Sequence, residues 1–93
     1  MEGNFIKLAN DAEYRVYWFG DRSASKSPSI SFQLYNEMPI LEAVQTFTGV
    51  PKITWIIKHD HGKDLTAEYE GFTMIDAISI TQNRPAITLR KPD

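Results

Sequence analysis

The segment 59–64, His-Asp-His-Gly-Lys-Asp, holds the side chains best suited to metal chemistry, including both histidines of the chain. If a strand continued through this segment, His59 and His61 would point to the same side, and Asp64 could supply a third ligand for a divalent cation. The chain has no third histidine, however, and Gly62-Lys63 predicts a turn that splays these side chains. We therefore expect a polar hairpin tip. The alternative is a metal site at His59, His61 and Asp64, which would make the protein a small metal-dependent enzyme if the metal were catalytic.

The residue composition and motifs argue against other kinds of catalytic site. The chain has no cysteine, which excludes thiolate nucleophiles, disulfides and Cys-type zinc sites, and it has no Gly-rich phosphate loop or nucleophile elbow. Glu68 and Glu70 would point the same way along one strand and could act as an acid–base pair on a sugar. Their alternation with Leu65, Ala67 and Tyr69 already accounts for them as the solvent face of that strand. We expect no enzymatic activity and no cofactor.

The length and charge of the chain limit the classes of protein to which it can belong. The 93 residues, 42% of them apolar, predict a single domain over 1–93 with its own core. A formal net charge of −2 disfavours electrostatic binding to nucleic acid, which needs a concentrated basic face. Charged residues interrupt the first twenty positions, and no apolar run approaches the roughly 18 residues that cross a bilayer. We expect a cytoplasmic protein without a membrane partner.

Alternation of apolar and polar residues predicts strands along most of the chain. The predicted strands are 5–8, 14–19, 30–35, 52–58, 65–70, 73–81 and 86–91. A helical period replaces the alternation from about 38 to 48, where one stripe is apolar. The stripe consists of Ile40, Leu41, Val44 and Phe47. The sequence therefore predicts an α+β fold, with an antiparallel sheet or small barrel of about six to seven strands and one short helix.

The order of three strands, a helix and further strands is also that of an OB-type barrel, a fold that often binds oligonucleotides. Aromatic side chains on such a barrel can stack against unpaired bases. An alternative function is therefore single-stranded nucleic-acid binding through Trp18, Trp55 and Arg15. A C-terminal hairpin beyond the fifth strand departs from that fold.

Bulky side chains on both faces distinguish the 14–19 strand, because alternation places Tyr17 and Phe19 opposite to Val16 and Trp18. Together with a serine-rich loop at 21–29 and strand edges available for pairing, this favours a non-enzymatic protein-binding module. Pairing of two copies through an edge strand is a further expectation. The candidate contact residues are Tyr17, Phe19, Arg22, Lys26 and Tyr35.

The C-terminal third resembles the ends of small uncharacterised bacteriophage and prophage proteins. The similarity lies in Glu-Tyr-Glu-Gly-Phe-Thr at 68–73, in Ala-Ile-Ser-Ile at 77–80 and in the closing segment 86–92. This resemblance implies a virion-associated component or a small protein that binds and disables a host enzyme, located in the virion or the host cytoplasm. It implies no role for any single residue.

Overall fold

The computed structural model describes residues 3–22, 24, 26–49, 52–59, 61–81 and 84–91, with the backbone alone for 73–81. Seven strands and one helix follow one another along the chain. They are β1 (Gly3–Leu8), β2 (Glu13–Arg22), β3 (Ser29–Leu34), α1 (Ile40–Phe47), β4 (Lys52–Lys58), β5 (Leu65–Glu70), β6 (Thr73–Thr81) and β7 (Arg84–Arg90). The predicted α+β class is confirmed, and three predicted strands, at 52–58, 65–70 and 73–81, have the predicted bounds.

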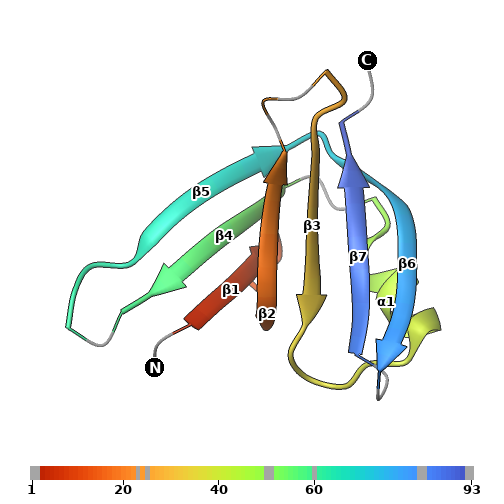
Figure 1. Ribbon diagram of the computed structural model, residues 1–93, viewed down its shortest axis with the longest axis horizontal. Helices are drawn as coiled ribbons and strands as arrows, with labels where there is room; N and C mark the ends of the chain where they lie inside the picture. Colours follow the sequence, from red (N-terminus) through yellow and green to blue (C-terminus); the bar gives the residue numbers. More distant parts are fainter. Residues whose placement is uncertain are drawn as a thin grey trace.

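The strands form one antiparallel sheet in the order β5-β4-β1-β2-β3-β7-β6 (Figure 1). The first five strands have the neighbours that they would have in an OB-type barrel. Such a barrel closes by pairing its third and fifth strands, whereas here β3 pairs with β7 of the C-terminal hairpin. The sheet is therefore open, with β5 and β6 as its edges.

The two edge strands come together at one end of the sheet, although five strands lie between them in the sheet order. Only Gly71 and Phe72 separate the last residue of β5 from the first residue of β6. Three Cα–Cα steps of about 3.8 Å can span at most about 11 Å. The sheet must therefore curl strongly, and Gly71 makes the corner with φ 76°, a conformation that favours glycine.

The concave face of the curled sheet carries the core. Its buried side chains come from every strand whose side chains the structure describes, namely Ile6, Leu8, Val16, Ile30, Phe32, Leu34, Ile53, Tyr69, Ile87 and Leu89. The helix α1 lies behind β7 and β6 in the view of Figure 1 and covers this face with Ala43 and Phe47. The ring of Phe47 meets Phe32 and Tyr14 edge-on, with centroids 5.4 and 5.7 Å away.

The predicted apolar stripe of the helix was partly wrong. Phe47 is buried, but Leu41 is 75% exposed and Val44 is also exposed. Once Phe47 points into the core, Ala43 lies one turn before it on the same side, while Leu41 lies about 240° away around the helix.

Within the described ranges, no helix combines the length and the apolarity that a membrane crossing requires.

A β-bulge in β2 overturns the predicted alternation of that strand. Val16 pairs with Leu34, but the next printed pair joins Trp18 to Gln33, so Tyr17 is an extra residue on β2. Tyr17 and Trp18 are both exposed, on the convex face, and every later residue of the strand changes sides. The prediction that Trp18 shares a face with Val16 was therefore wrong.

Phe19 shows the consequence of the bulge. It packs against the core, nearly parallel to Trp55 at 4.5 Å between centroids and to Phe32 at 6.0 Å. Its predicted place beside Tyr17 on an outer surface was wrong, because the extra residue reverses its direction. Phe19 contributes to stability through aromatic packing.

Candidate functional site

All four arginines of the chain lie on the convex face of the three adjacent strands β2, β3 and β7. At one end, Arg22 pairs with Ser29, and Ser29 pairs on its other side with Arg90. Directly opposed residues present their side chains on the same face of a sheet. Arg22 and Arg90 therefore flank Ser29 on the face opposite to the core, which we call the arginine face.

Arg15 and Arg84 flank Tyr35 in the same way at the other end of the arginine face. The backbone N–H of Tyr35 donates to the carbonyl of Arg15 at 2.9 Å. Beyond the Gln33–Ala86 pair, the register of β3 with β7 brings Arg84 opposite Tyr35. The guanidinium carbons of Arg15 and Arg84 lie 4.3 and 5.9 Å from the centroid of the Tyr35 ring, so this ring contacts a cation from each neighbouring strand.

The bulge adds a second tyrosine to this end of the face. Arg84 donates from Nη1 to Oη of Tyr17 at 2.8 Å, and its guanidinium carbon lies 5.5 Å from the Tyr17 ring centroid. The rings of Tyr17 and Tyr35 are 4.8 Å apart and tilted by 48°. Although they are held in place by these contacts, Tyr17 and Tyr35 remain 46% and 36% exposed.

Gln33 holds the third exposed ring, that of Trp18. Its Oε1 accepts from Nε1 of Trp18 at 3.2 Å, while its Nε2 donates to the carbonyl of Arg84 at 3.1 Å. The Trp18 ring lies beside Gly20, two residues further along β2. Trp18 is 40% exposed, so one partly buried amide fixes an exposed indole to the neighbouring strands.

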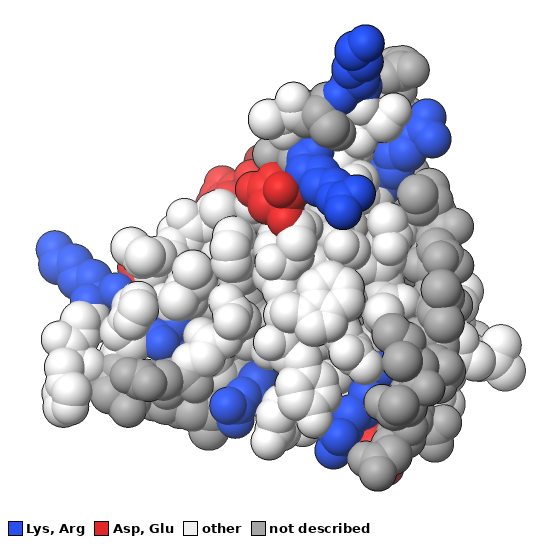
Figure 2. All heavy atoms as spheres, viewed as in Figure 1, with Lys and Arg blue, Asp and Glu red and all other residues white. Residues whose placement is uncertain are grey.

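Two rows of residues lie between the arginines on this face. One row consists of the small residues Gly20, Ser31 and Thr88, and the other consists of Trp18, Gln33 and Ala86. Figure 2 shows this face with an uncharged centre and basic side chains around it, while acidic side chains are visible mainly near the top. The frame of arginines spans two strand spacings, about 10 Å, by the six residue steps from Ser29 to Tyr35, about 20 Å.

The structure brings together three of the five predicted contact residues. Tyr17, Tyr35 and Arg22 lie on the arginine face, and Lys26 is exposed in the connection between β2 and β3. Phe19 lies on the opposite face.

Sequence reasoning missed several residues of the arginine face, namely Gln33, Arg84 and Arg90, and it named Trp18 and Arg15 only for the nucleic-acid alternative. The even spacing of Arg84 and Arg90 in β7 could have indicated a shared face. On β2, Arg15 and Arg22 have opposite parity, so only the bulge places them together.

The alternative nucleic-acid platform of Trp18, Trp55 and Arg15 was wrong in its geometry. Trp55 lies on the concave side, where its Nε1 donates to Oδ1 of Asn4 at 3.1 Å and its ring packs against the core. Trp18 and Arg15 lie on the other side of the sheet. These three side chains therefore cannot contact one strand of bases together.

The predicted hairpin tip at 59–64 lies between β4 and β5, and its described histidines and Asp64 are exposed. Asp60 lies outside the described residues. Among the residues that the structure describes, no three His, Cys, Asp or Glu side chains come close enough to hold a metal ion. A Cβ on Gly62 would lie 3.6 Å from Cβ of His59, as expected where the chain folds back in a turn.

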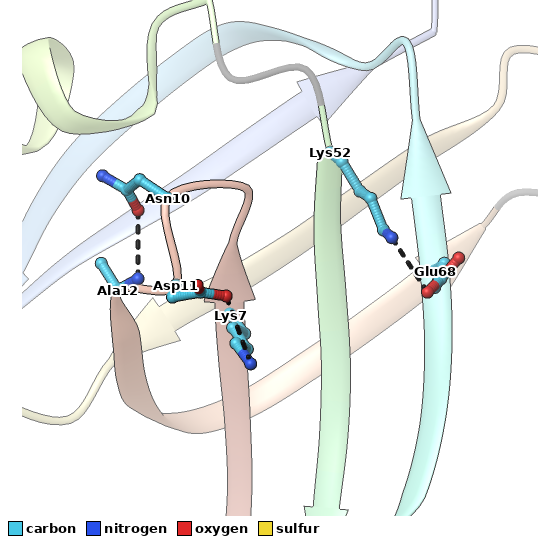
Figure 3. Close-up of polar contacts among 6 residues, drawn as sticks. All are labelled: Lys7, Asn10, Asp11, Ala12, Lys52 and Glu68. Carbon is cyan, nitrogen blue, oxygen red and sulfur yellow. Dashed lines mark hydrogen bonds and ion pairs between the residues drawn. The ribbon is translucent and has the colours of Figure 1, made fainter.

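A second charged region lies on the outer side of β1, β4 and β5 (Figure 3). Lys52 lies 3.0 Å from Glu68, and Lys7 lies 3.4 Å from Asp11, around a hollow of about 420 Å³. Glu68 and Glu70 are both exposed, as their alternation predicted. Because each lysine shown is paired with a carboxylate, this region offers little net charge to a ligand.

Comparisons with protein-family models, curated proteins and solved structures find no match to this chain. They do not test the resemblance of the C-terminal third to phage and prophage proteins, which stays a prediction. The chemistry of the arginine face is therefore the basis for a functional proposal.

Proposed function

We propose that this chain is a non-enzymatic protein-binding module that docks its partner on the arginine face. The observation that carries the proposal is the gathering of three exposed aromatic rings and all four arginines on one side of three strands. Tryptophan, tyrosine and arginine are the residue types that contribute most binding free energy at protein interfaces. Their presence together on a convex surface, outside the core, favours recognition over packing.

The side chains of this surface are also held in fixed orientations. Arg84 is bonded to Tyr17, and Gln33 is bonded to Trp18 and to the carbonyl of Arg84. A contact residue that is ordered before binding loses less conformational entropy when the partner arrives. The bonded network around Arg84 and Gln33 therefore supports a role of these rings as anchors.

Single-stranded nucleic-acid binding is the second candidate, since arginines and aromatic rings share one face and the first five strands follow the order of an OB-type barrel. Bases need open ring faces on which to stack. Tyr35 has two guanidinium groups near its ring, and Tyr17 has Arg84 and Tyr35 beside it. This arrangement favours a protein partner over a strand of bases.

Affinity capture from an extract of the cells that naturally make the protein tests the proposal. We expect the wild-type chain to retain a specific protein, and Trp18→Ala to retain at least about tenfold less of it, as a central anchor should. Leu41→Ala is the matched control, because Leu41 is exposed on α1, away from the arginine face. Equal retention by all three chains would overturn the proposal.

The resemblance to phage and prophage proteins suggests the class of partner, a virion component or a host enzyme.

Pairing of two copies through an edge strand is a separate expectation, for which β5 and β6 supply the edges. Light scattering at two protein concentrations tests the dimer without reference to the arginine face.

A further inference from the structure

We infer that the edge strand β5 binds an extended basic segment of another protein, which adds a strand to the sheet. Within the described sheet, β5 has a strand neighbour on one side only, and it forms the upper left rim in Figure 1. The backbone N–H and C=O groups along its outer side can pair with a second chain. Because β4 and β1 separate β5 from the arginine face, this inference goes beyond the proposed function.

The strand β5 lacks the usual features that keep an edge strand from pairing. Proteins protect such edges with proline, lysine or a β-bulge. Leu65–Glu70 contains neither proline nor lysine. Its six pairs with β4 run without a register shift, whereas shifts interrupt the pairing of β2 with β3 and of β6 with β7. It is therefore a regular template for an added strand.

Leu65 shows that this edge leaves apolar surface uncovered. It has the same parity as Tyr69 along β5, so both side chains point to the concave side. Tyr69 is buried, yet Leu65 is 58% exposed. A strand added beside β5 would set a side chain directly opposite Leu65 and cover it. Apolar residues at alternate positions of the segment fit this side.

The other side of β5 is acidic. Glu68 and Glu70 share one lysine of the neighbouring strand, since Nζ of Lys52 lies 3.0 Å from Oε1 of Glu68 and Lys52 is directly opposite Glu70 in the register. One negative charge remains among these three groups. Opposite charges on facing strands stabilise a sheet, so a basic side chain opposite Glu70 suits this position.

A hollow of about 450 Å³ extends the edge past its Glu70 end. The rings of Tyr69 and Phe72 meet edge-on there, with centroids 5.9 Å apart. They give the hollow an apolar part that can receive one apolar side chain at the end of the segment. The lining residues are Pro28, Glu68, Tyr69, Glu70, Phe72 and Lys91.

A second copy of this chain fits the edge poorly, because like charges would face each other. Two β5 strands related by a twofold axis can pair five residues in two antiparallel registers. The register centred on Ala67 sets Glu70 opposite Asp64, and the register centred on Glu68 sets the two copies of Glu68 opposite each other. Directly opposed like charges destabilise a pair of strands. A basic segment avoids this repulsion.

Fluorescence anisotropy of the labelled peptide Leu-Lys-Val-Lys-Val-Thr-Val, with protein at up to about 1 mM, tests the inference. In antiparallel pairing its lysines come opposite Glu70 and Glu68, its last valine comes opposite Leu65, and its leucine reaches the hollow. One control peptide has the same composition with its lysines and its valines grouped, and another has glutamate in place of lysine. Amide hydrogen exchange of 65–70 is measured with and without peptide.

We expect the alternating peptide to bind at least about tenfold more tightly than either control peptide. It should also slow exchange in 65–70, because an added strand bonds the outward amides of β5. Glu70→Gln should weaken binding about three- to fivefold through loss of one cross-strand charge pair. Glu42→Gln is the matched control, because Glu42 is exposed on α1, and it should leave binding unchanged.

Other outcomes would overturn the inference. They are equal binding of the alternating and grouped peptides, no binding of any peptide, and exchange in 65–70 that does not change. Protection of 65–70 that rises with protein concentration in the absence of peptide would assign the edge to a second copy instead. Trp18→Ala should bind the peptide as the wild type does, and a loss there would move the site to the arginine face. Failure at β5 therefore leaves the proposed function standing.

Discussion

Tyr69 on β5 donates a hydrogen bond of 2.5 Å to Oδ2 of Asp21 on β2. In the order of the sheet, β4 and β1 lie between these two strands. The contact is possible because the sheet curls until the end of β2 reaches across to β5, and because the bulge turns Asp21 toward the concave side. This hydrogen bond joins the two halves of the sheet at the end where the edge strands come together.

Replacing Tyr69 by phenylalanine should lower the free energy of unfolding at pH 7 by about 1.5 to 3 kcal/mol, the usual contribution of a hydrogen bond to a charged group. Burial, followed by the hydrogen bond and the negative charge of Asp21, raises the pKa of Tyr69 above its ordinary value. The unfolded chain therefore ionises first, and stability should fall as the pH rises above about 10.

Urea denaturation at a series of pH values measures both effects. The difference in stability between wild type and Tyr69→Phe should be full at neutral pH and shrink above about pH 10, where the unfolded wild-type tyrosine loses its proton. Tyr35→Phe, on the exposed convex face, serves as the control. A difference that stays constant to high pH would show that the hydroxyl of Tyr69 is not held by Asp21.

The bulge predicts unequal losses of stability when two neighbouring aromatic residues are truncated. Phe19→Ala removes a ring that packs on Phe32 and Trp55, and should cost about 3 kcal/mol. Trp18→Ala removes an exposed ring with one side-chain hydrogen bond, and should cost about 1 kcal/mol or less. Urea midpoints of the two variants measure the costs. A larger loss for Trp18→Ala would place the bulge elsewhere.

Gln33 is expected to control the mobility of Trp18. Gln33→Leu removes the acceptor for the indole N–H and the donor to the carbonyl of Arg84. In a Trp55→Phe background, in which Trp18 is the only tryptophan, time-resolved fluorescence anisotropy should show faster local motion of the indole. Gln45→Leu on the exposed side of α1 provides the control. Unchanged anisotropy would mean that the ring is fixed by its neighbours instead.

The corner between the two edge strands should depend on glycine. Gly71→Ala forces a Cβ into the left-handed region at φ 76°, which costs about 1 to 2 kcal/mol. Steric crowding does not contribute, because the nearest atom to that Cβ would be Cε of Lys91 at 4.0 Å. Gly62→Ala in the β4–β5 turn is the control and should cost less. Thermal unfolding of both variants compares them directly.

The strands, the helix and the exposed tip at 59–64 were predictable because alternation and helical period are local properties of the sequence. Lys52–Lys58 and Leu65–Glu70 have the predicted bounds, and Phe47 faces the core as expected. The orientation of Leu41 was not predictable, since an eight-residue helix with several apolar residues can turn more than one face to a sheet.

The sequence by itself determined a small α+β domain, its strand-rich composition and the absence of cysteine chemistry. Only the tertiary structure decided which side chains share a surface. One extra residue at the β2 bulge reverses the alternation, sends Phe19 inward and brings Arg22 to the side of Arg15. Such a bulge depends on pairing with a strand far along the chain, which no local pattern of residues encodes. The arginine face exists because the pairing of β2, β3 and β7 places the four arginines on one side of the sheet.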